Sequence, residues 1–290
     1  VIAEKVDLSA VQKIRDEGLN RSKLDDLASY LTDVIGGRLT NSPGSRKANE
    51  WAAETFRSWG LANVKVEPWD TTFGRGWEVV SYSGRIVEPW TKPLDAYPQA
   101  WSGSTLDARG RPAGVSCPVI VLDIQDSSDV AKYAGKLKGA CVLRGAPPVI
   151  GPEFTPSERR TTLDNLLNPP PPQQFGGGGG GGGQGNFQRL QAMNALGTAL
   201  VRAEQPAAVL QSSGWTYGII RNGGHFDGGR ARDSIYNPIP HLLIAHEQYG
   251  TLYRVAKRGL PVRVELNLQT RFLDDNRTPA NVIAELPGTD

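Results

Sequence analysis

A short apolar run at the end of the sequence constrains the fold more than any other feature. Residues 281–285, with the sequence NVIAE, are typical of a β-strand, and Pro287-Gly288 predicts a turn directly after them. We expect this strand to join the same sheet as the strands that follow the N-terminal helices. The sequence between these two parts is then an insertion into one α/β domain, which we expect to be completed by residues outside this sequence.

Two amphipathic helices are predicted near the N-terminus. In residues 22–35, leucine, valine and isoleucine recur at helical spacing after a serine N-cap, until two glycines end the run. In residues 45–59, Trp51 and Trp59 lie on one apolar stripe that stops at a glycine. Each stripe predicts a buried helix face, and the two tryptophans predict a substantial core. Strands expected at 64–66 and 77–82 complete a helix-to-strand order that opens many α/β domains.

The middle of the sequence alternates short apolar runs with glycine and proline turns. The runs predict strands at 119–122, 140–143, 207–210 and 242–245, helices at 187–204 and 247–257, and a return strand within 262–272. We therefore predict three parts. Residues 1–92 hold the N-terminal helices and the first part of the α/β domain, residues 93–262 form the inserted domain, and residues 263–290 return to the first domain.

A proline and glycine insert at residues 169–183 interrupts the inserted domain. Four prolines are followed by eight consecutive glycines, 176–183, which have no side chain to bury and the most backbone entropy to lose. Such a segment is expected to be a disordered linker without a role. The alternative hypothesis is that the glycine run lies close against another subunit or domain.

Charge and hydropathy exclude two classes of partner. Lys and Arg number 32 against 30 Asp and Glu, so a net charge of +2 gives no reason to expect nucleic acid. No apolar run approaches the roughly 20 residues that a membrane-spanning helix needs. The sequence begins with Val1 rather than Met, which indicates a removed leader or a trimmed chain, and a removed leader would place the protein outside the cytosol.

The two cysteines, Cys117 and Cys141, stand near predicted strands and 24 positions apart. One disulfide between them would stabilise the protein by roughly 3 kcal/mol. Two buried free thiols are an equally good interpretation of the sequence.

Two histidine patterns resemble metal motifs. His246 and the glutamate after it begin the HExxH zinc motif, but Gly250 stands where the second histidine is needed, so one helix face cannot supply two ligands. His225 and Asp227 have a His-x-Asp spacing that puts both side chains on one face of an extended segment and could serve a divalent metal. Their flanking glycines favour a solvated loop instead.

No catalytic residue is predicted in this chain. His241, at the start of a predicted strand, is expected to be a partly buried, hydrogen-bonded residue. There is no G-x-S-x-G elbow, the cysteines lie in strands, and the glycine run lacks the lysine of a phosphate-binding loop.

Several stretches, taken together, resemble one known family. The stretches 33–44, 48–51, 59–64, 73–77 and 281–288 are similar in order and spacing to the di-zinc exopeptidases that include bacterial aminopeptidases and plasma glutamate carboxypeptidase. Between them, 136–143, 207–210 and 238–249 resemble the protease-associated domain that is often inserted in that family. The resemblance covers nearly all of the 290 residues, with the proline and glycine insert as its main departure.

The resemblance implies a fold and a place for the metal. The fold would be a partial zinc-exopeptidase three-layer α/β domain interrupted by an inserted α+β protease-associated domain. In the family, two zinc ions activate a water that a glutamate base steers onto a peptide carbonyl, and the ligands follow the strand that corresponds to 281–285. This chain would therefore contain no metal ligand, and His225 and Asp227 lie upstream of the family's metal motif. The chain by itself is expected to be inactive.

Partners and location follow from the same resemblance. The chain would supply the scaffold and a lid to a C-terminal catalytic segment or a separate catalytic chain, with a peptide as substrate, in a secreted or periplasmic protein; a homo-oligomer is also compatible with the sequence. Arg75 and Trp77 are candidates for residues at the substrate entrance. A rigid turn that packs Trp77 into the core is the alternative interpretation of the same loop.

The sequence is also compatible with a second class of function. The chain could be a non-enzymatic module in which a protease-associated domain binds a protein or peptide and no metal takes part. Zinc content and peptide turnover distinguish the two.

Overall fold

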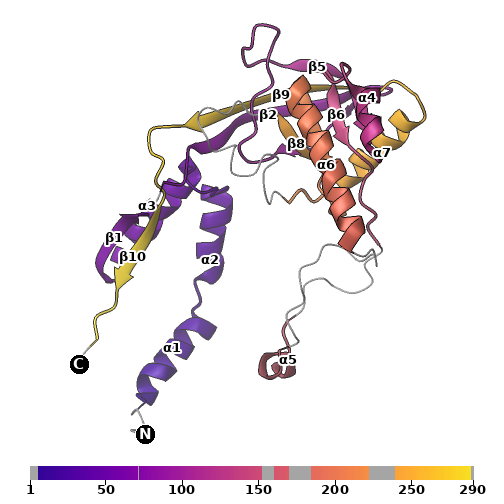
Figure 1. Ribbon diagram of the computed structural model, residues 1–290. Coiled ribbons are helices and arrows are strands. Elements are labelled where there is room, and N and C mark those ends of the chain that lie inside the picture. The colour runs from indigo at the N-terminus through magenta and orange to yellow at the C-terminus, as the bar shows by residue number, and fades with distance from the viewer. Residues whose placement is uncertain (1–5, 71, 152–159, 170–183, 222–238, 289–290) are drawn as a thin grey trace. The chain divides into compact units, whose positions relative to one another are not determined.

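The computed structural model describes residues 6–70, 72–151, 160–169, 184–221 and 239–288 (Figure 1). The described residues fall into two compact units. The first lies within Val1–Glu78 and Arg271–Asp290, and the second within Val79–Phe226 and Pro238–Thr270. The two compact units divide at 78/79 and 270/271. The limits of the protease-associated domain, 92/93 and 262/263, stay a prediction.

The first unit joins the two ends of the sequence in a two-stranded sheet. Strand β1 (Ala62–Pro68) pairs antiparallel with β10 (Ala280–Glu285), with Val66 opposite Val282 and an irregularity between Ala62 and Lys65. Helix α3 (Pro43–Ser58) packs on both strands (Figure 1). The prediction that residues 281–285 pair with the strand expected at 64–66 is confirmed. The strand expected at 77–82 is part of β2 (Gly76–Glu88), which belongs to the other sheet, so its place in the same sheet is wrong.

The N-terminal helices bury less than their apolar stripes predict. Helix α2 (Leu24–Ser29) continues as a π-helical segment (Tyr30–Ile35), and neither contains a buried residue. In α3 only Ala53 is buried, and Trp59 is 54% exposed. Tyr30 stacks on Trp51 with ring centroids 5.2 Å apart. The expected buried face of residues 22–35 and the expected tryptophan core are therefore wrong for the described part of the chain, because the neighbouring elements cover these stripes only in part.

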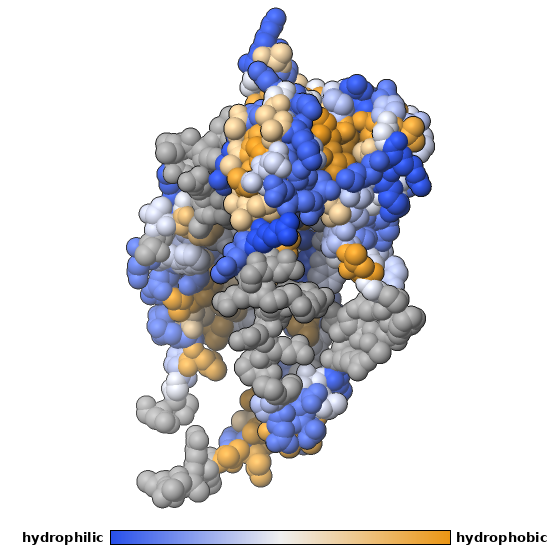
Figure 2. Space-filling model, turned by 45° about the vertical axis from the view of Figure 1, so that its right-hand side comes forward, coloured by the Kyte–Doolittle hydropathy of each residue, from blue (hydrophilic) through white to orange (hydrophobic). Residues whose placement is uncertain are grey.

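An additional helix, α1 (Leu8–Asn20), precedes the two that were predicted. The Asp7 carboxylate accepts hydrogen bonds from the backbone N–H groups of Ser9 and Ala10, at 2.9 and 3.2 Å, and caps this helix. None of its residues is buried, and Leu8 and Ile14 are largely exposed. Figure 2 shows that hydrophobic residues are exposed among hydrophilic ones on one face of the protein.

The second unit is built on a mixed sheet. Its strand order is β3-β2-β9-β5-β6-β7-β8-β4. The strands are β2 (Gly76–Glu88), β3 (Lys92–Pro93), β4 (Ala96–Pro98), β5 (Val115–Leu122), β6 (Cys141–Arg144), β7 (Ala208–Ser212), β8 (His241–Ile244) and β9 (Arg263–Leu273). Strands β5, β6, β7 and β8 run parallel to one another, whereas β9 pairs antiparallel with the first half of β5.

Each face of the parallel strands is covered by a helix. Helix α6 (Gln184–Glu204) contributes Val201 to a cluster with Val142 and Val209, and α7 (His246–Lys257) contributes Tyr249 and Leu252 to the core on the other face (Figure 1). Strands buried on both faces need apolar residues at every position, which is why these four read as continuous apolar runs. The strands and helices predicted for this region are confirmed within a few residues.

Three short helices complete the described structure: a 3₁₀ turn (Ser127–Asp129), α4 (Val130–Tyr133) and α5 (Leu163–Leu167). The polyglycine run lies outside the described residues, as do His225 and Asp227. No helix in the described part of the chain has both the length and the hydropathy needed to cross a bilayer.

Candidate functional site

Asn41 ties three segments of the first unit together. It is 2% exposed, and its side-chain Nδ2 donates to the carbonyl oxygens of Gly74, at 3.0 Å, and Asn276, at 2.6 Å. Its φ of 62° is a left-handed conformation that asparagine tolerates better than most residues. A Cβ on Gly76 would lie 2.2 Å from the Asn41 carbonyl oxygen, so only glycine fits there. The stretches 33–44 and 73–77 thus meet at this point.

The two predicted entrance residues are both buried. Arg75 is 7% exposed, and its guanidinium carbon lies 3.8 Å from the centre of the Phe272 ring, in a cation–π contact. Trp77 is 4% exposed. Neither side chain presents a surface to solvent, and their role at a substrate entrance stays a prediction.

Polar contacts fasten α3 to the segment before β10. Arg46 Nη1 lies 2.8 Å from Asp275 Oδ2, and Arg46 Nη2 donates to the carbonyl oxygen of Asn276 at 3.2 Å. Asn49 Nδ2 donates to the carbonyl oxygen of Ala280 at 2.9 Å. These contacts place the start of β10 against the helix.

Cys117 and Cys141 form a disulfide between β5 and β6, with their Cα atoms 5.6 Å apart. Cys117 lies opposite Val264 of β9, and Cys141 lies opposite Val119 of β5. The bond therefore joins the two strands at the point where β5 changes from an antiparallel to a parallel partner.

The described histidines have structural partners. His241 is 1% exposed in β8, and burial, followed by the positive charge of Arg144, lowers its pKa to about 3. His246 Nδ1 lies 2.9 Å from Ser212 Oγ. Glu247 accepts hydrogen bonds from the backbone N–H groups of Tyr217 and Gly218, at 2.7 and 3.3 Å.

The residues present do not fit a zinc site. Within the described ranges, no three His, Cys, Asp or Glu side chains gather closely enough to hold a metal ion. The described part of this chain therefore offers no set of donors for zinc, and no chemical step of this chain is assigned to a metal.

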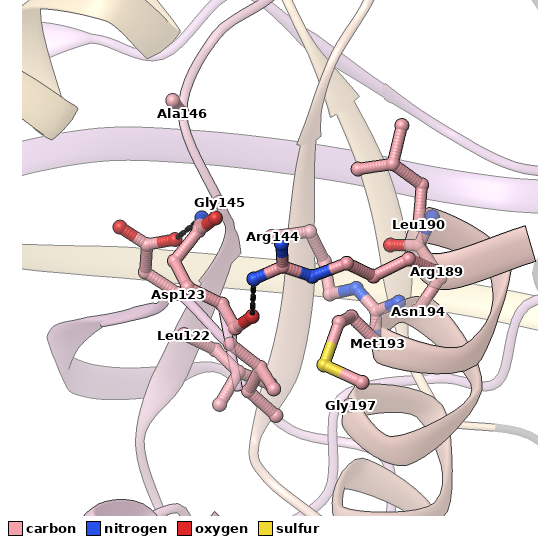
Figure 3. A pocket seen from close by; sticks show the side chains of 12 residues that line it. Leu122, Asp123, Arg144, Gly145, Ala146, Arg189, Leu190, Met193, Asn194 and Gly197 are labelled. Atoms are coloured by element: carbon pink, nitrogen blue, oxygen red, sulfur yellow. Dashed lines mark hydrogen bonds between the residues drawn. The ribbon is translucent and has the colours of Figure 1, made fainter. Parts of the chain in front are cut away.

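A pocket of about 390 Å³ lies in the second unit, where β5 and β6 end. It is lined by residues 122–125, by residues 144–146 and by the face of α6 from Arg189 to Gly197, and we call it the carboxyl-edge pocket. Figure 3 shows Arg189 reaching from α6 towards the segment after β5, and Arg144 extending from the end of β6 towards α6. No sequence motif marked either arginine, because the two come from elements 45 residues apart that only the fold brings together.

Comparisons with known proteins give a fold. No family model matches the chain, and no curated protein does. Among solved structures, the peptidase M28 precursor from Shewanella amazonensis SB2B aligns with 95% of this chain and 53% of its own, at 18% identity and a TM-score of 0.54. The zinc aminopeptidase BSAP from Bacillus subtilis aligns with 91% of this chain and 47% of its own, at 14% identity and a TM-score of 0.44.

A further match is the aminopeptidase from Aneurinibacillus sp. strain AM-1, over 95% of this chain and 51% of its own, at 14% identity and a TM-score of 0.39. The chain spans about half the length of the structures that it matches. The first match carries the conclusion that the chain has a mixed α/β fold of the M28 peptidase type. The predicted α/β fold class is confirmed, and the inserted protease-associated domain stays a prediction.

Proposed function

We propose that this chain is the scaffold and lid portion of a zinc-dependent metallo-exopeptidase, an aminopeptidase or carboxypeptidase that hydrolyses terminal peptide bonds. The observation that supports this most is the likeness of fold to the peptidase M28 precursor, which extends over 95% of this chain. The sequence supports it independently, since two of the stretches that resemble the exopeptidases, 33–44 and 73–77, meet at Asn41.

In this proposal the two units have different tasks. The first unit, with β1, β10 and α3, contributes to the scaffold of the catalytic domain, and the second is an inserted protease-associated domain that narrows access so that a free chain end enters. Because the Arg75 and Trp77 side chains are buried, they would act on the entrance by fixing the shape of the 73–77 loop. The two zinc ions belong to residues outside this chain, in a C-terminal segment or a separate chain.

The proposed location is outside the cytosol, either secreted or periplasmic. The disulfide between Cys117 and Cys141 supports this, because such bonds form and persist mainly in oxidising compartments. A peptide is the proposed substrate, and a homo-oligomer is a further proposal that size measurements in solution would test.

The test uses the natural polypeptide that carries this sequence. Zinc is measured by elemental analysis, and turnover is measured on one short peptide in three forms: free at both ends, acetylated at the N-terminus, and amidated at the C-terminus. We expect two zinc ions per polypeptide and the loss of turnover when one end is blocked, with activity removed by a chelator and restored by zinc. The 290-residue chain by itself should show no turnover.

Two results would contradict the proposal. Turnover that survives complete removal of zinc would exclude a metallopeptidase. A natural polypeptide with neither zinc nor turnover would favour the alternative, a non-enzymatic module that binds a protein or peptide.

A further inference from the structure

The carboxyl-edge pocket lies where α/β proteins usually bind small molecules. Strands β5 and β6 are parallel neighbours, with Leu122 opposite Arg144 at their carboxyl ends. Ligands of open α/β sheets bind in the crevice beyond these ends, because the loops there are free to diverge while the strands hold them in place. The pocket volume of about 390 Å³ is at the lower end of the range for small-molecule sites, so its size suits an amino acid or a dipeptide.

The charge at the pocket favours an anion. Arg144 and Arg189 both line it, and among the lining residues that the structure describes only Asp123 carries a carboxylate. That carboxylate is already engaged, since Asp123 Oδ2 lies 3.2 Å from Lys257 Nζ and Oδ1 accepts from Gln125 Nε2 at 2.6 Å. Asp126 lies near Arg189 outside the lining, and its carboxylate accepts the Ser128 N–H at 2.9 Å.

The positive charge of Arg144 is held in a largely buried position. Burial lowers the pKa of its guanidinium, although arginine stays charged in proteins. Its neighbour His241 stays neutral near pH 7 because its pKa is about 3. The imidazole therefore adds no positive charge beside the guanidinium.

Both guanidinium groups are positioned by the protein. Arg189 Nη2 donates to the carbonyl oxygen of Gln125 at 3.1 Å, the contact drawn in Figure 3, and Arg144 Nη2 donates to Thr198 Oγ1 at 3.2 Å. The loop that carries Gln125 is itself fixed, because Asp129 Oδ2 accepts the backbone N–H of Gln125 at 2.9 Å. Side chains that are held in place lose less entropy when a ligand binds.

The rest of the wall is mixed, with the polar side chains of Gln125 and Asn194 beside an apolar part. Leu122, Leu190 and Met193 line the pocket beside the arginines. Gly197 lies inside α6, where glycine costs about 1 kcal/mol relative to alanine. A Cβ at this position would lie 3.6 Å from both Arg144 Nη1 and Ile124 Cδ1, so the glycine keeps space open next to the cation.

We propose that the carboxyl-edge pocket binds a small organic carboxylate of amino-acid or dipeptide size, with the carboxylate on Arg144 and Arg189 and an apolar side chain against Leu122, Leu190 and Met193. Guanidinium and carboxylate have matching planar geometry, and hydrogen bonds between charged groups are the stronger kind. This site does not depend on the proposed peptidase function, because all of its residues belong to the second unit.

Binding is tested by calorimetry on the 290-residue chain with four probes: N-acetyl-leucine, N-acetyl-leucinamide, N-acetyl-leucyl-leucine and inorganic phosphate. We expect both carboxylates to bind at least about tenfold more tightly than the amide, since a hydrogen bond to a charged group contributes about 1.5–3 kcal/mol. The tighter of the two carboxylates tells whether the pocket prefers a ligand of one residue or of two. Phosphate should bind more weakly than either, because it has no apolar part.

Two variants and one control locate the site. Arg189→Gln removes an exposed charge without opening the core and should weaken N-acetyl-leucine binding at least about tenfold. Gly197→Leu replaces glycine with a better helix former whose side chain fills the pocket, and it should also weaken binding. Arg254→Gln, an exposed arginine on α7 that does not line the pocket, should bind like the unmodified chain, and circular dichroism checks that all variants fold.

The proposal fails if acid and amide bind equally, if phosphate binds more tightly than the carboxylates, or if Arg189→Gln and Arg254→Gln have the same effect. Its failure is separate from that of the peptidase proposal. If the chain binds carboxylates but the natural polypeptide has neither zinc nor turnover, the pocket proposal is supported and the peptidase proposal is contradicted. If the natural polypeptide is a zinc peptidase but the chain does not bind carboxylates, the peptidase proposal is supported and the pocket proposal is contradicted.

Discussion

The second unit buries a hydrophobic layer on each face of its parallel strands, whereas in the first unit Ala53 and Trp77 are the only buried hydrophobic residues among those that the structure describes. A two-stranded sheet is only marginally stable by itself in water. The first unit therefore depends on α3 and on polar contacts such as those of Asn41 and Arg46, while the second depends on core packing. Substitutions of the same kind should have very different effects in the two units.

The largest expected effect is that of a truncation in the core of the second unit. Leu143 is fully buried, so Leu143→Ala should lower the free energy of unfolding by about 2–5 kcal/mol. The matched truncation in the first unit, Val34→Ala, removes a side chain that is 65% exposed and should change stability by less than about 0.5 kcal/mol. Urea unfolding followed by fluorescence measures both, and equal effects would show that the contrast between the units is wrong.

Removal of the disulfide between Cys117 and Cys141 has the second-largest expected effect on stability. Replacing Cys117 and Cys141 with alanine should cost about 3 kcal/mol, because the bond closes a loop of 24 residues in the unfolded chain. The loss should be confined to the second unit. Hydrogen exchange of β1 and β10 should be unchanged by the double substitution, and faster exchange there would mean that the two units unfold together.

Acid should weaken the second unit through His241. Its pKa is about 3 in the folded chain and 6.5 when unperturbed, so between these values the unfolded chain binds a proton that the folded chain does not. The free energy of unfolding therefore falls as pH falls from about 6.5 towards 3, by up to about 1.4 kcal/mol per pH unit. In His241→Gln this contribution is absent. Unfolding measured at pH 6.5 and 4.5 on both chains tests it, and identical pH slopes would sink the assignment.

The smallest expected effect concerns the ion pair of the first unit. Arg46 and Asp275 are partly exposed, so Arg46→Ala should cost only about 0.2–1 kcal/mol. Hydrogen exchange of residues 274–280 is the readout that is most sensitive to such a local loss. If Arg46→Ala instead unfolded β10, the polar contacts would be more important to the first unit than its ladder of backbone hydrogen bonds.

The sequence predicted where helices and strands lie better than it predicted which side chains are buried. The parallel strands of the second unit were recognisable because a strand that is buried on both faces must be apolar throughout. The strand at residues 281–285 was recognisable because turn residues directly follow its short apolar run. Helix α1 was missed, although Asp7 followed by periodic apolar residues is a usable signal. Trp59 illustrates the limit, since an apolar stripe shows which face of a helix could be covered but not what covers it.

The sequence predicted the residues that line a site less well than it predicted helices, strands or burial. Arg75 stood out in the sequence as a cation in a loop, yet it is buried on Phe272. No pattern in the sequence indicated Arg144 or Arg189, although both line the carboxyl-edge pocket. Single cations carry no pattern, so only their placement in space distinguishes a packed side chain from a ligand-binding one.

The sequence by itself determined the class of fold and the order of its elements, since apolar periodicity and turn residues act over short distances along the chain. The tertiary structure decided which residues meet. It paired residues 62–68 with 280–285, joined Asn41 to Gly74 and Asn276, and brought two arginines to the ends of β5 and β6. Contacts between distant residues depend on how whole strands and helices pack, and no local pattern encodes that packing.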